Sequence, residues 1–101
     1  MFIVTVVYEV PAEHVAVFRE AILRNAAASV ENEETCRQFD VSFSENGQRC
    51  FLYEKYDNAE AFAAHRQTAH FHTFFTAVSP LVSGKTLETF ALADNPYLTQ
   101  V

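Results

Sequence analysis

The chain is predicted to fold as an α+β domain with the element order β-α-β-β-α-(α)-β, the ferredoxin-like arrangement. Three observations predict it: an apolar strand-like segment at the N-terminus, an Asn46-Gly47 pair between two alternating segments, and two stretches with apolar residues at helical spacing. The 101 residues have the length of a single domain, residues 1–101. We expect a four-stranded antiparallel sheet with its helices on one face.

The N-terminal part is predicted to contain one strand and one long helix. Residues from Phe2 to Val10 are apolar on both strand faces, which is typical of a strand buried on both sides. Pro11 ends this strand and suits the first turn of a helix. A helix is predicted from about Ala12 to Glu34, because one of its stripes is apolar: Val15, Phe18 and Ile22.

A hairpin is predicted next, from Cys36 to Ser44 and from Arg49 to Asp57. Asn-Gly between alternating segments is the strongest short-range hairpin signal. If Asn46 and Gly47 form a two-residue turn, paired positions sum to 93. Three pairs on one face follow from this register: Val41 with Leu52, Phe43 with Cys50, and Phe39 with Glu54. Cys36 then pairs near Asp57, so that a Cys36–Cys50 disulfide is not expected.

The C-terminal part is predicted to contain two short helices and a last strand. Asn58 can cap a helix that carries Ala59 and Phe62. Thr68 can cap the next helix, which Pro80 and Gly84 end. The apolar stripe of that helix is Phe71, Phe74, Phe75, Val78 and Val82. The last strand is predicted from Thr86 to Ala93, and Asn95-Pro96 begins a tail.

The face of the sheet opposite the helices is predicted to be too apolar for water. Phe51, Tyr53 and parts of the first strand lie on it. Two such sheets packed face to face would bury these side chains, and we therefore expect a two-fold homodimer.

Composition excludes several classes of partner and cofactor. The net charge of −6 disfavours binding to nucleic acid or to an anionic membrane surface. No apolar run has the length of a membrane span, and the first residues lack a charged leader, which favours a cytoplasmic protein. Nucleotide-binding motifs and the GxSxG elbow are absent from the sequence, so that no bound cofactor is predicted.

Glu54 is a carboxylate on the strand face that should lie beneath the helices. Burial of an unpaired carboxylate is costly, and such groups often mark a functional site or an ion pair. The structural alternative is a Glu54 at the sheet edge that reaches solvent or Arg37. The first helix has a similar anomaly, because its apolar stripe continues into Asn25 and Ser29. These two residues line a cavity, or they meet water where the helix passes the sheet edge.

Three of the four histidines lie close together in the sequence: His65, His70 and His72. His65 and His70 flank the break between the two short helices, where both side chains could point inward. Zinc binding is one alternative, although no HExxH motif or paired cysteines accompany them. We interpret them as acid–base or hydrogen-bonding groups. His72 lies off the apolar stripe and is expected at the surface.

Several segments together resemble the antibiotic biosynthesis monooxygenase family. They are Cys36–Val41, Phe51–Tyr56, Ala61–His65 followed by His70-Phe71, and the inward pair Asn25 and Ser29. The likeness extends from Phe2 to Gly84 and implies a dimeric α+β barrel that is often a cofactor-free oxygenase of phenolic or quinol substrates. The stretch Tyr53-Glu54…His65…His70 is equally similar to a family member that isomerises phosphorylated autoinducer-2. Asn25, Glu54, His65 and His70 fall on the family's pocket positions.

The sequence departs from that family in two places. It has no Trp, whereas oxygenase members often have one in the pocket or on the third strand, where Tyr56 stands here. Glu33-Glu34-Thr35 replaces the usual Gly before the second strand.

Three functions follow from these residues. In the first, a monooxygenase binds an aromatic diol, Glu54 or a histidine removes a phenolic proton, and Asn25 holds the oxyanion. In the second, an isomerase acts on a small phosphorylated carbonyl compound, with Glu54 as base and His65 or His70 as acid. In the third, a non-enzymatic dimer binds a metabolite. The predicted catalytic residues are Glu54, His65 and His70, and the predicted substrate-binding residues are Asn25, Ser29, Phe39, Phe43, Tyr56, Phe62 and Phe74.

Two structural features would separate these functions. A Glu54 that points into a closed cavity favours an enzyme. An arginine that reaches the same cavity favours a phosphorylated substrate, because a phosphate group needs cationic partners. The candidate cations are Arg24, Arg37, Arg66 and Lys55.

Overall fold

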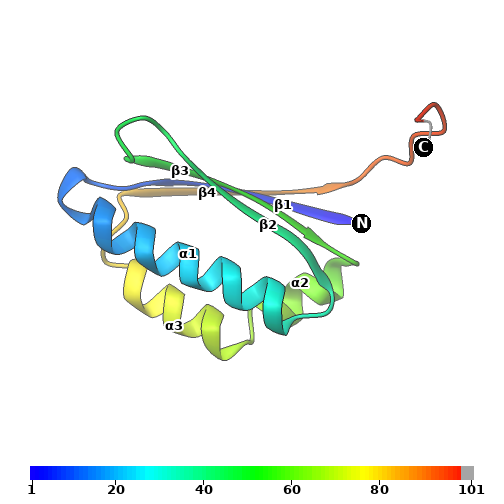
Figure 1. Ribbon diagram of the computed structural model, residues 1–101, viewed down its shortest axis with the longest axis horizontal. Coiled ribbons are helices and arrows are strands. Elements are labelled where there is room, and N and C mark those ends of the chain that lie inside the picture. Colours follow the sequence, from blue (N-terminus) through cyan, green and yellow to red (C-terminus); the bar gives the residue numbers. More distant parts are fainter. Residues whose placement is uncertain (99–101) are drawn as a thin grey trace.

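A four-stranded antiparallel sheet carries all of the helices on one face, as Figure 1 shows. The structure is a computed structural model that describes residues 1–98, and the last three positions of the predicted 1–101 domain lie outside the described residues. The strand order is β2-β3-β1-β4, which is the ferredoxin-like topology expected. The elements are β1 (Phe2–Glu9), a 3₁₀ helix (Ala12–His14), α1 (Val15–Asn32), β2 (Cys36–Phe43), β3 (Arg49–Tyr56), α2 (Ala59–His65), α3 (Ala69–Val78) and β4 (Gly84–Ala91).

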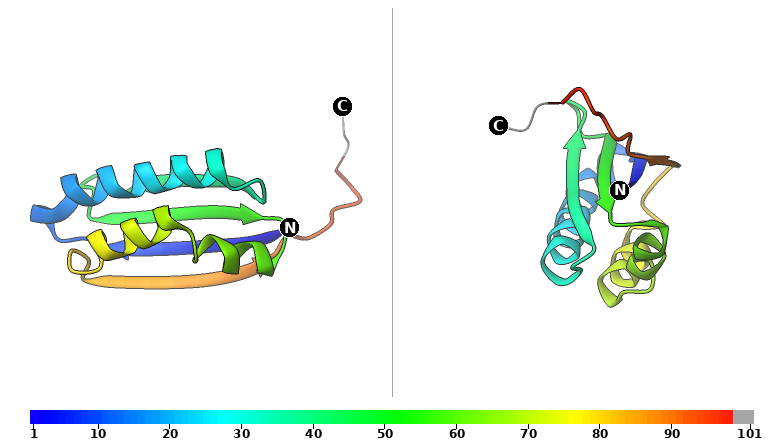
Figure 2. Two further views of the ribbon diagram at one scale, coloured as in Figure 1. Left: turned by 90° about the horizontal axis from the view of Figure 1, so that it is seen from below. Right: turned by 90° about the vertical axis from the view of Figure 1, so that its right-hand side faces the viewer.

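The core lies between the sheet and the helices. Side chains alternate along a strand, so that Val4, Val6 and Tyr8 of β1 all face the helices and are buried there. From α1, Phe18 and Ile22 meet them, as the apolar stripe of the sequence predicts. Figure 2 shows α1 running beside α3 and α2, with the sheet behind all three.

The hairpin has the predicted register but a different turn. Phe39 pairs with Glu54, Val41 with Leu52, and Phe43 with Cys50. Gly47 is the one described residue with a positive φ, at 76°, whereas a two-residue type I′ turn needs two such residues. A longer loop therefore connects the strands. An irregularity between Cys36 and Gln38 moves Cys36 opposite Tyr56 instead of near Asp57, and both cysteines are free thiols.

Two predicted boundaries are corrected. The first helix does not run unbroken from Ala12, because a separate 3₁₀ helix precedes α1. The last strand is Gly84–Ala91 rather than Thr86–Ala93. Its length follows from pairing, since β4 matches β1 residue for residue, from Glu9 opposite Gly84 to Phe2 opposite Ala91.

Both predicted helix caps are confirmed. The Asn58 side chain accepts a hydrogen bond from the Ala61 amide at 2.8 Å, and the Thr68 hydroxyl accepts one from the Phe71 amide at 3.2 Å. These caps fix where α2 and α3 begin, and so determine where His65 and His70 lie.

The sheet face opposite the helices exposes large apolar side chains. Phe51 of β3 is 44% exposed and Phe90 of β4 is 48% exposed. Their pairing partners on β1, Val7 and Ile3, lie on the same face. Among the described residues, no helix has both the length and the apolar character of a membrane span.

Candidate functional site

A small cavity lies between the helix-facing side of the sheet and the two C-terminal helices. Its volume is about 20 Å³, which is room for a single water molecule. The wall is mostly aromatic and aliphatic, with a few polar or charged side chains. The lining residues of interest are Asn25, Phe39, Glu54, Phe62, His65 and Phe74, together with Arg66, Phe71, Lys85 and Leu87.

Glu54 is a buried carboxyl group on the wall of this cavity. It is 3% exposed, and its Oε1 accepts a 2.6 Å hydrogen bond from the Tyr56 hydroxyl. Burial raises the pKa of Glu54 to about 7, against smaller opposing effects of the Tyr56 hydrogen bond and the Lys85 charge. A carboxyl group with such a pKa can both accept and release a proton near neutral pH. The alternative in which Glu54 reaches solvent or Arg37 is wrong, because Arg37 pairs instead with Asp57 at 2.7 Å.

Asn25 brings an unpartnered acceptor to the same cavity. The residue is 4% exposed, and its side-chain oxygen is buried without a hydrogen-bond partner among the described residues. A buried polar atom without a partner is rare and costly. The free atom is an acceptor, so that it would suit a hydroxyl donor of a bound molecule better than an oxyanion. Ser29 is also buried, but its hydroxyl donates to the Asn25 backbone carbonyl at 2.7 Å.

His65 faces the cavity and is held from behind by Glu33. His65 is 2% exposed, and its Nδ1 lies 2.9 Å from Glu33 Oε2. His70 Nε2 lies 2.5 Å from the same oxygen. We name Glu33, His65 and His70 the Glu33 triad. Burial lowers the pKa of His65, and the Glu33 hydrogen bond partly opposes this shift.

The Glu33 triad is also the described cluster whose ligand atoms lie close enough for one metal ion, within 4.8 Å of one another. Two ligands of a tetrahedral zinc ion, each about 2.1 Å from it, are roughly 3.4 Å apart. The Glu33–histidine separations of 2.9 and 2.5 Å are shorter than this and indicate direct hydrogen bonds instead of two ligands on one ion. The geometry as it stands is that of a hydrogen-bonded triad.

Four of the predicted site residues lie outside the cavity. Ser29 is turned toward the helix backbone. Phe43 lies toward the hairpin end of its strand, where the Arg19 guanidinium stands 4.7 Å from its ring centroid. Tyr56 is fully buried and reaches the site only through its hydrogen bond to Glu54. His70 lies on the far side of Glu33 from the cavity, with its side chain 20% exposed.

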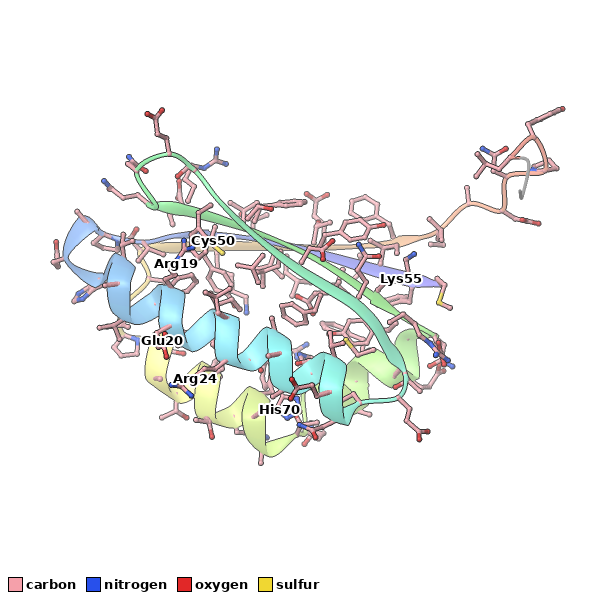
Figure 3. All side chains as sticks on the ribbon, in the orientation of Figure 1. Arg19, Glu20, Arg24, Cys50, Lys55 and His70 are labelled. Carbon is pink, nitrogen blue, oxygen red and sulfur yellow. The ribbon has the colours of Figure 1, made fainter. Side chains whose placement is uncertain are left out.

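An open apolar groove of about 680 Å³ runs between α1 and α3. Arg24 and His70 lie along it (Figure 3). Asn25 and Phe74 line both this groove and the small cavity, so that they separate the two spaces. His70 therefore faces the groove, while His65 faces the cavity.

Glu33 and Lys85 are residues of the site that the sequence patterns do not identify, whereas Arg66 is one of the four cations considered there for a phosphorylated substrate. In the sequence, Glu33 is noted only as part of a departure from a family pattern. A carboxylate at the C-terminus of a helix is electrostatically unfavourable, and this position could have indicated that Glu33 has a specific role. Arg66 follows His65 directly and lines the cavity. Lys85 comes from β4, and its position depends on the pairing of that strand with β1.

Comparison with known proteins supports one family. The family model described as "Antibiotic biosynthesis monooxygenase" matches residues 1–77. Among curated proteins, none matches the chain. A Nitrosomonas europaea structure, provisionally described as an antibiotic biosynthesis monooxygenase, is 27% identical with a TM-score of 0.85, covering 90% of this chain and 97% of that one.

Two further solved structures share this architecture. A Bacteroides thetaiotaomicron protein of unknown function, described as a possible oxidoreductase, is 29% identical with a TM-score of 0.81. The match covers 88% of this chain and 94% of that one. A Deinococcus radiodurans structure with a TM-score of 0.86 covers 99% of this chain and 100% of its own. At 20% identity, it shows likeness of fold alone.

Proposed function

Because the chain belongs to the antibiotic biosynthesis monooxygenase family, we propose that it is a cofactor-independent monooxygenase of a small quinol-type aromatic compound. The observation that carries this proposal is Glu54, a buried carboxyl group with a pKa of about 7 on the wall of an aromatic cavity. Phe39, Phe62 and Phe74 supply the apolar surface that would contact a flat ring.

Glu54 is the base in this proposal. It takes the proton of a phenolic hydroxyl, and the electron-rich phenolate then reduces O₂ directly. The substrate is the only reductant and supplies all four electrons that O₂ accepts, so that a hydroquinone and O₂ become a hydroxyquinone and water. One oxygen atom enters the ring and the other leaves as water, which receives the protons released by the substrate. Asn25 would accept a hydrogen bond from a substrate hydroxyl and orient the ring.

The cavity must open before such a substrate can bind. Its present volume of about 20 Å³ is far below the roughly 300 Å³ of the smallest usual ligand pockets. Arg66, Lys85 and Leu87 are exposed residues of the wall, so that movement of these surface side chains would open the cavity. We therefore regard the described conformation as the closed form of the site.

The proposal is tested by oxygen uptake with a panel of hydroquinones and dihydroxyaromatic compounds. The wild-type protein is compared with Glu54→Gln, in the presence of EDTA and without added flavin. Glu60→Gln is the matched control, because Glu60 is exposed in the first turn of α2. Uptake that Glu54→Gln abolishes and Glu60→Gln retains is the expected result. No uptake with any compound, or equal uptake by the two variants, would contradict the proposal.

An isomerase of a small phosphorylated carbonyl compound is the second candidate, and the cations at the cavity favour it. The Arg66 guanidinium stands 5.7 Å from the Phe62 ring centroid, and Lys85 Nζ stands 5.6 Å from that of Tyr8. Both cations line the same cavity. Burial lowers the pKa of Lys85, and the Arg66 charge lowers it further. Such a pair suits a phosphate group.

In the isomerase, Glu54 would take a proton from the hydroxyl-bearing carbon next to a carbonyl, and His65 would protonate the carbonyl oxygen to give an enediol. Glu54 would then return the proton to the former carbonyl carbon, while the neighbouring hydroxyl gives its own proton back to His65 and becomes the new carbonyl group. Deuterium exchange into phosphorylated ketones, followed by NMR, tests this reaction. Exchange should fall strongly in Arg66→Gln and persist in Arg49→Gln, a control on the exposed end of β3. If the protein binds a metabolite but shows neither oxygen uptake nor deuterium exchange, the third function, a non-enzymatic metabolite-binding dimer, would be favoured.

We also propose that the protein is a homodimer in which a second copy covers the outer face of the sheet. Phe51 and Phe90 provide the support, because both are large, apolar and nearly half exposed. Exposed apolar patches of this kind commonly mark protein interfaces.

A further inference from the structure

We propose that Glu33 is a positioning residue, which holds His65 in its Nδ1–H form and thereby keeps Nε2 unprotonated at the cavity. This role rests on the proposed function, because it makes His65 a second proton acceptor beside Glu54. It also assigns His70 to the support of Glu33 rather than to the cavity.

The hydrogen bonds of the Glu33 triad carry the first part of the argument. Glu33 Oε2 is 2.9 Å from His65 Nδ1, and Oε1 is 3.2 Å from it. A carboxylate only accepts hydrogen bonds, so that the imidazole proton must lie on Nδ1. A neutral imidazole carries one such proton, and its Nε2 is then a lone pair. The side-chain hydrogen bonds that His65 forms within residues 1–98 use Nδ1 and the backbone carbonyl, and none uses Nε2, which leaves Nε2 available to a ligand.

The position of Glu33 indicates that its contact with the histidines compensates an unfavourable location. Glu33 is the C-terminal cap of α1, and its amide donates to the Ser29 carbonyl at 3.0 Å. The helix dipole places partial negative charge at this end, which repels a carboxylate. Its side chain is nonetheless only 10% exposed. Two imidazole donors on one oxygen offset this cost, and they bind the end of α1 to α2 and α3.

The surroundings of His65 restrict the ring to one orientation. Tyr56 and Phe71 pack against it with ring centroids 5.4 and 5.3 Å away. The Thr68 hydroxyl donates to the His65 carbonyl at 2.7 Å and fixes the end of α2. The charged or titratable groups that affect the His65 pKa are Glu33, His70 and Arg66.

The proposed reaction releases two hydroxyl protons and therefore needs a second proton acceptor, which we assign to His65. A hydroquinone carries two hydroxyl protons, and Glu54 accepts one of them. The other passes to Nε2 of His65, which becomes an imidazolium ion beside the Glu33 carboxylate. Both protons then go to the oxygen atom that leaves as water, so that the two residues return to their starting forms. Glu33 itself exchanges no proton, because its function is to orient and stabilise the ring.

Nitrogen-15 NMR of the histidine rings tests the assignment without any substrate. At a pH where His65 is neutral, we expect a protonated Nδ1 and an unprotonated Nε2. Glu33→Gln should shift His65 toward the Nε2–H form and lower its pKa, because the neighbouring charge is lost. Glu33→Asp should restore part of both properties. Glu34→Gln, the adjacent exposed carboxylate, and His72→Asn are the matched controls and should change neither.

Three results would overturn the assignment. They are a wild-type His65 protonated on Nε2, a Glu33→Gln variant that folds but keeps the wild-type tautomer and pKa, and stoichiometric Zn²⁺ binding that Glu33→Gln abolishes. If oxygen uptake is found, Glu33→Gln should lower kcat about 100-fold and move the acidic limb of the pH profile to lower pH. A tautomer shift without uptake on any compound would refute the proposed function and leave the positioning role intact.

Discussion

The Tyr56 hydroxyl donates a 2.6 Å hydrogen bond to Oε1 of Glu54, in a part of the core that water barely reaches. The two residues lie two positions apart on β3 and therefore point to the same face of the sheet. Burial raises the pKa of Glu54 to about 7, and the Tyr56 hydrogen bond keeps it from rising further. The pair thus sets the protonation state of the proposed base.

Tyr56→Phe should raise the pKa of Glu54 above its present value, because the hydrogen bond that stabilises the carboxylate is lost. The buried acceptor left without its donor should also lower the free energy of unfolding by about 1–3 kcal/mol. Titration of the Glu54 carboxyl by carbon-13 NMR measures the first effect, and urea unfolding measures the second. Tyr53→Phe, on the opposite face of the sheet, is the control; an equal shift there would contradict the prediction.

Glu54→Gln should become more stable than the wild-type protein as the pH rises. The pKa of Glu54 is raised from 4.5 to about 7 by folding, so that its ionisation opposes the folded state. The free energy of unfolding of the wild type should therefore fall by about 3 kcal/mol in total as the pH rises from about 4.5 to 7. The variant has no carboxyl group at this position and should not show this decrease. Urea unfolding at pH 5 and pH 8 measures the difference, and a variant advantage independent of pH would refute the buried carboxyl assignment.

Asn25→Leu should preserve or increase the free energy of unfolding, by up to about 1 kcal/mol, because a buried unpartnered oxygen is removed. Oxygen uptake should fall in the same variant, since the acceptor proposed for the substrate hydroxyl is gone. Ser29→Ala is an informative comparison one helical turn away. It loses the 2.7 Å hydrogen bond to the Asn25 carbonyl and should be destabilised by about 1 kcal/mol. A strongly destabilised Asn25→Leu would show that Asn25 is a structural residue.

Thr68→Ala should destabilise the protein by about 0.5–2 kcal/mol, because α3 loses its N-terminal cap. The same hydroxyl holds the His65 carbonyl, so that this variant should also broaden the His65 ring signals in NMR. Asn58→Ala loses the cap of α2 alone and should show the stability effect with smaller changes at His65. Thr73→Ala, on the exposed side of α3, should show neither effect.

Phe51→Glu should convert the proposed dimer to a monomer, because a charge would be buried between the two sheets. Sedimentation velocity at several protein concentrations measures the mass. Phe75→Glu provides the matched control, since Phe75 is exposed to a similar degree but lies on α3. A wild-type monomer at every concentration, or dissociation of both variants, would contradict the proposed interface.

Much of the fold was predictable because its signals are local. The register of the hairpin follows from the Asn46-Gly47 pair and the alternation around it, and the structure keeps that register even though the turn is longer. Asn58 and Thr68 cap helices through contacts only three residues away. Asn25 interrupts an apolar helical stripe, which allows either a cavity or contact with water beyond the sheet edge, and the structure shows that the residue is buried.

The residues that surround Glu54 and His65 were less predictable, because they come together from distant parts of the chain. Glu33 is separated by 32 residues from His65 in the sequence, and only the packing of α1 beside α2 and α3 makes them neighbours. Lys85 reaches the cavity because β4 pairs with the whole length of β1. Phe43 falls on the predicted strand face but lies too far toward the hairpin to reach the cavity.

The amino-acid sequence by itself therefore determined the order of the elements, the pairing of β2 with β3, and the presence of a carboxyl group and an amide on inward-facing surfaces. Periodicity, turn chemistry and capping act over a few residues, and short segments contain them in full. The tertiary structure alone decided that His65 faces the cavity while His70 faces the groove, and that both donate to Glu33. Those contacts depend on how the three helices pack against the sheet, and this packing is determined by side chains from all parts of the chain.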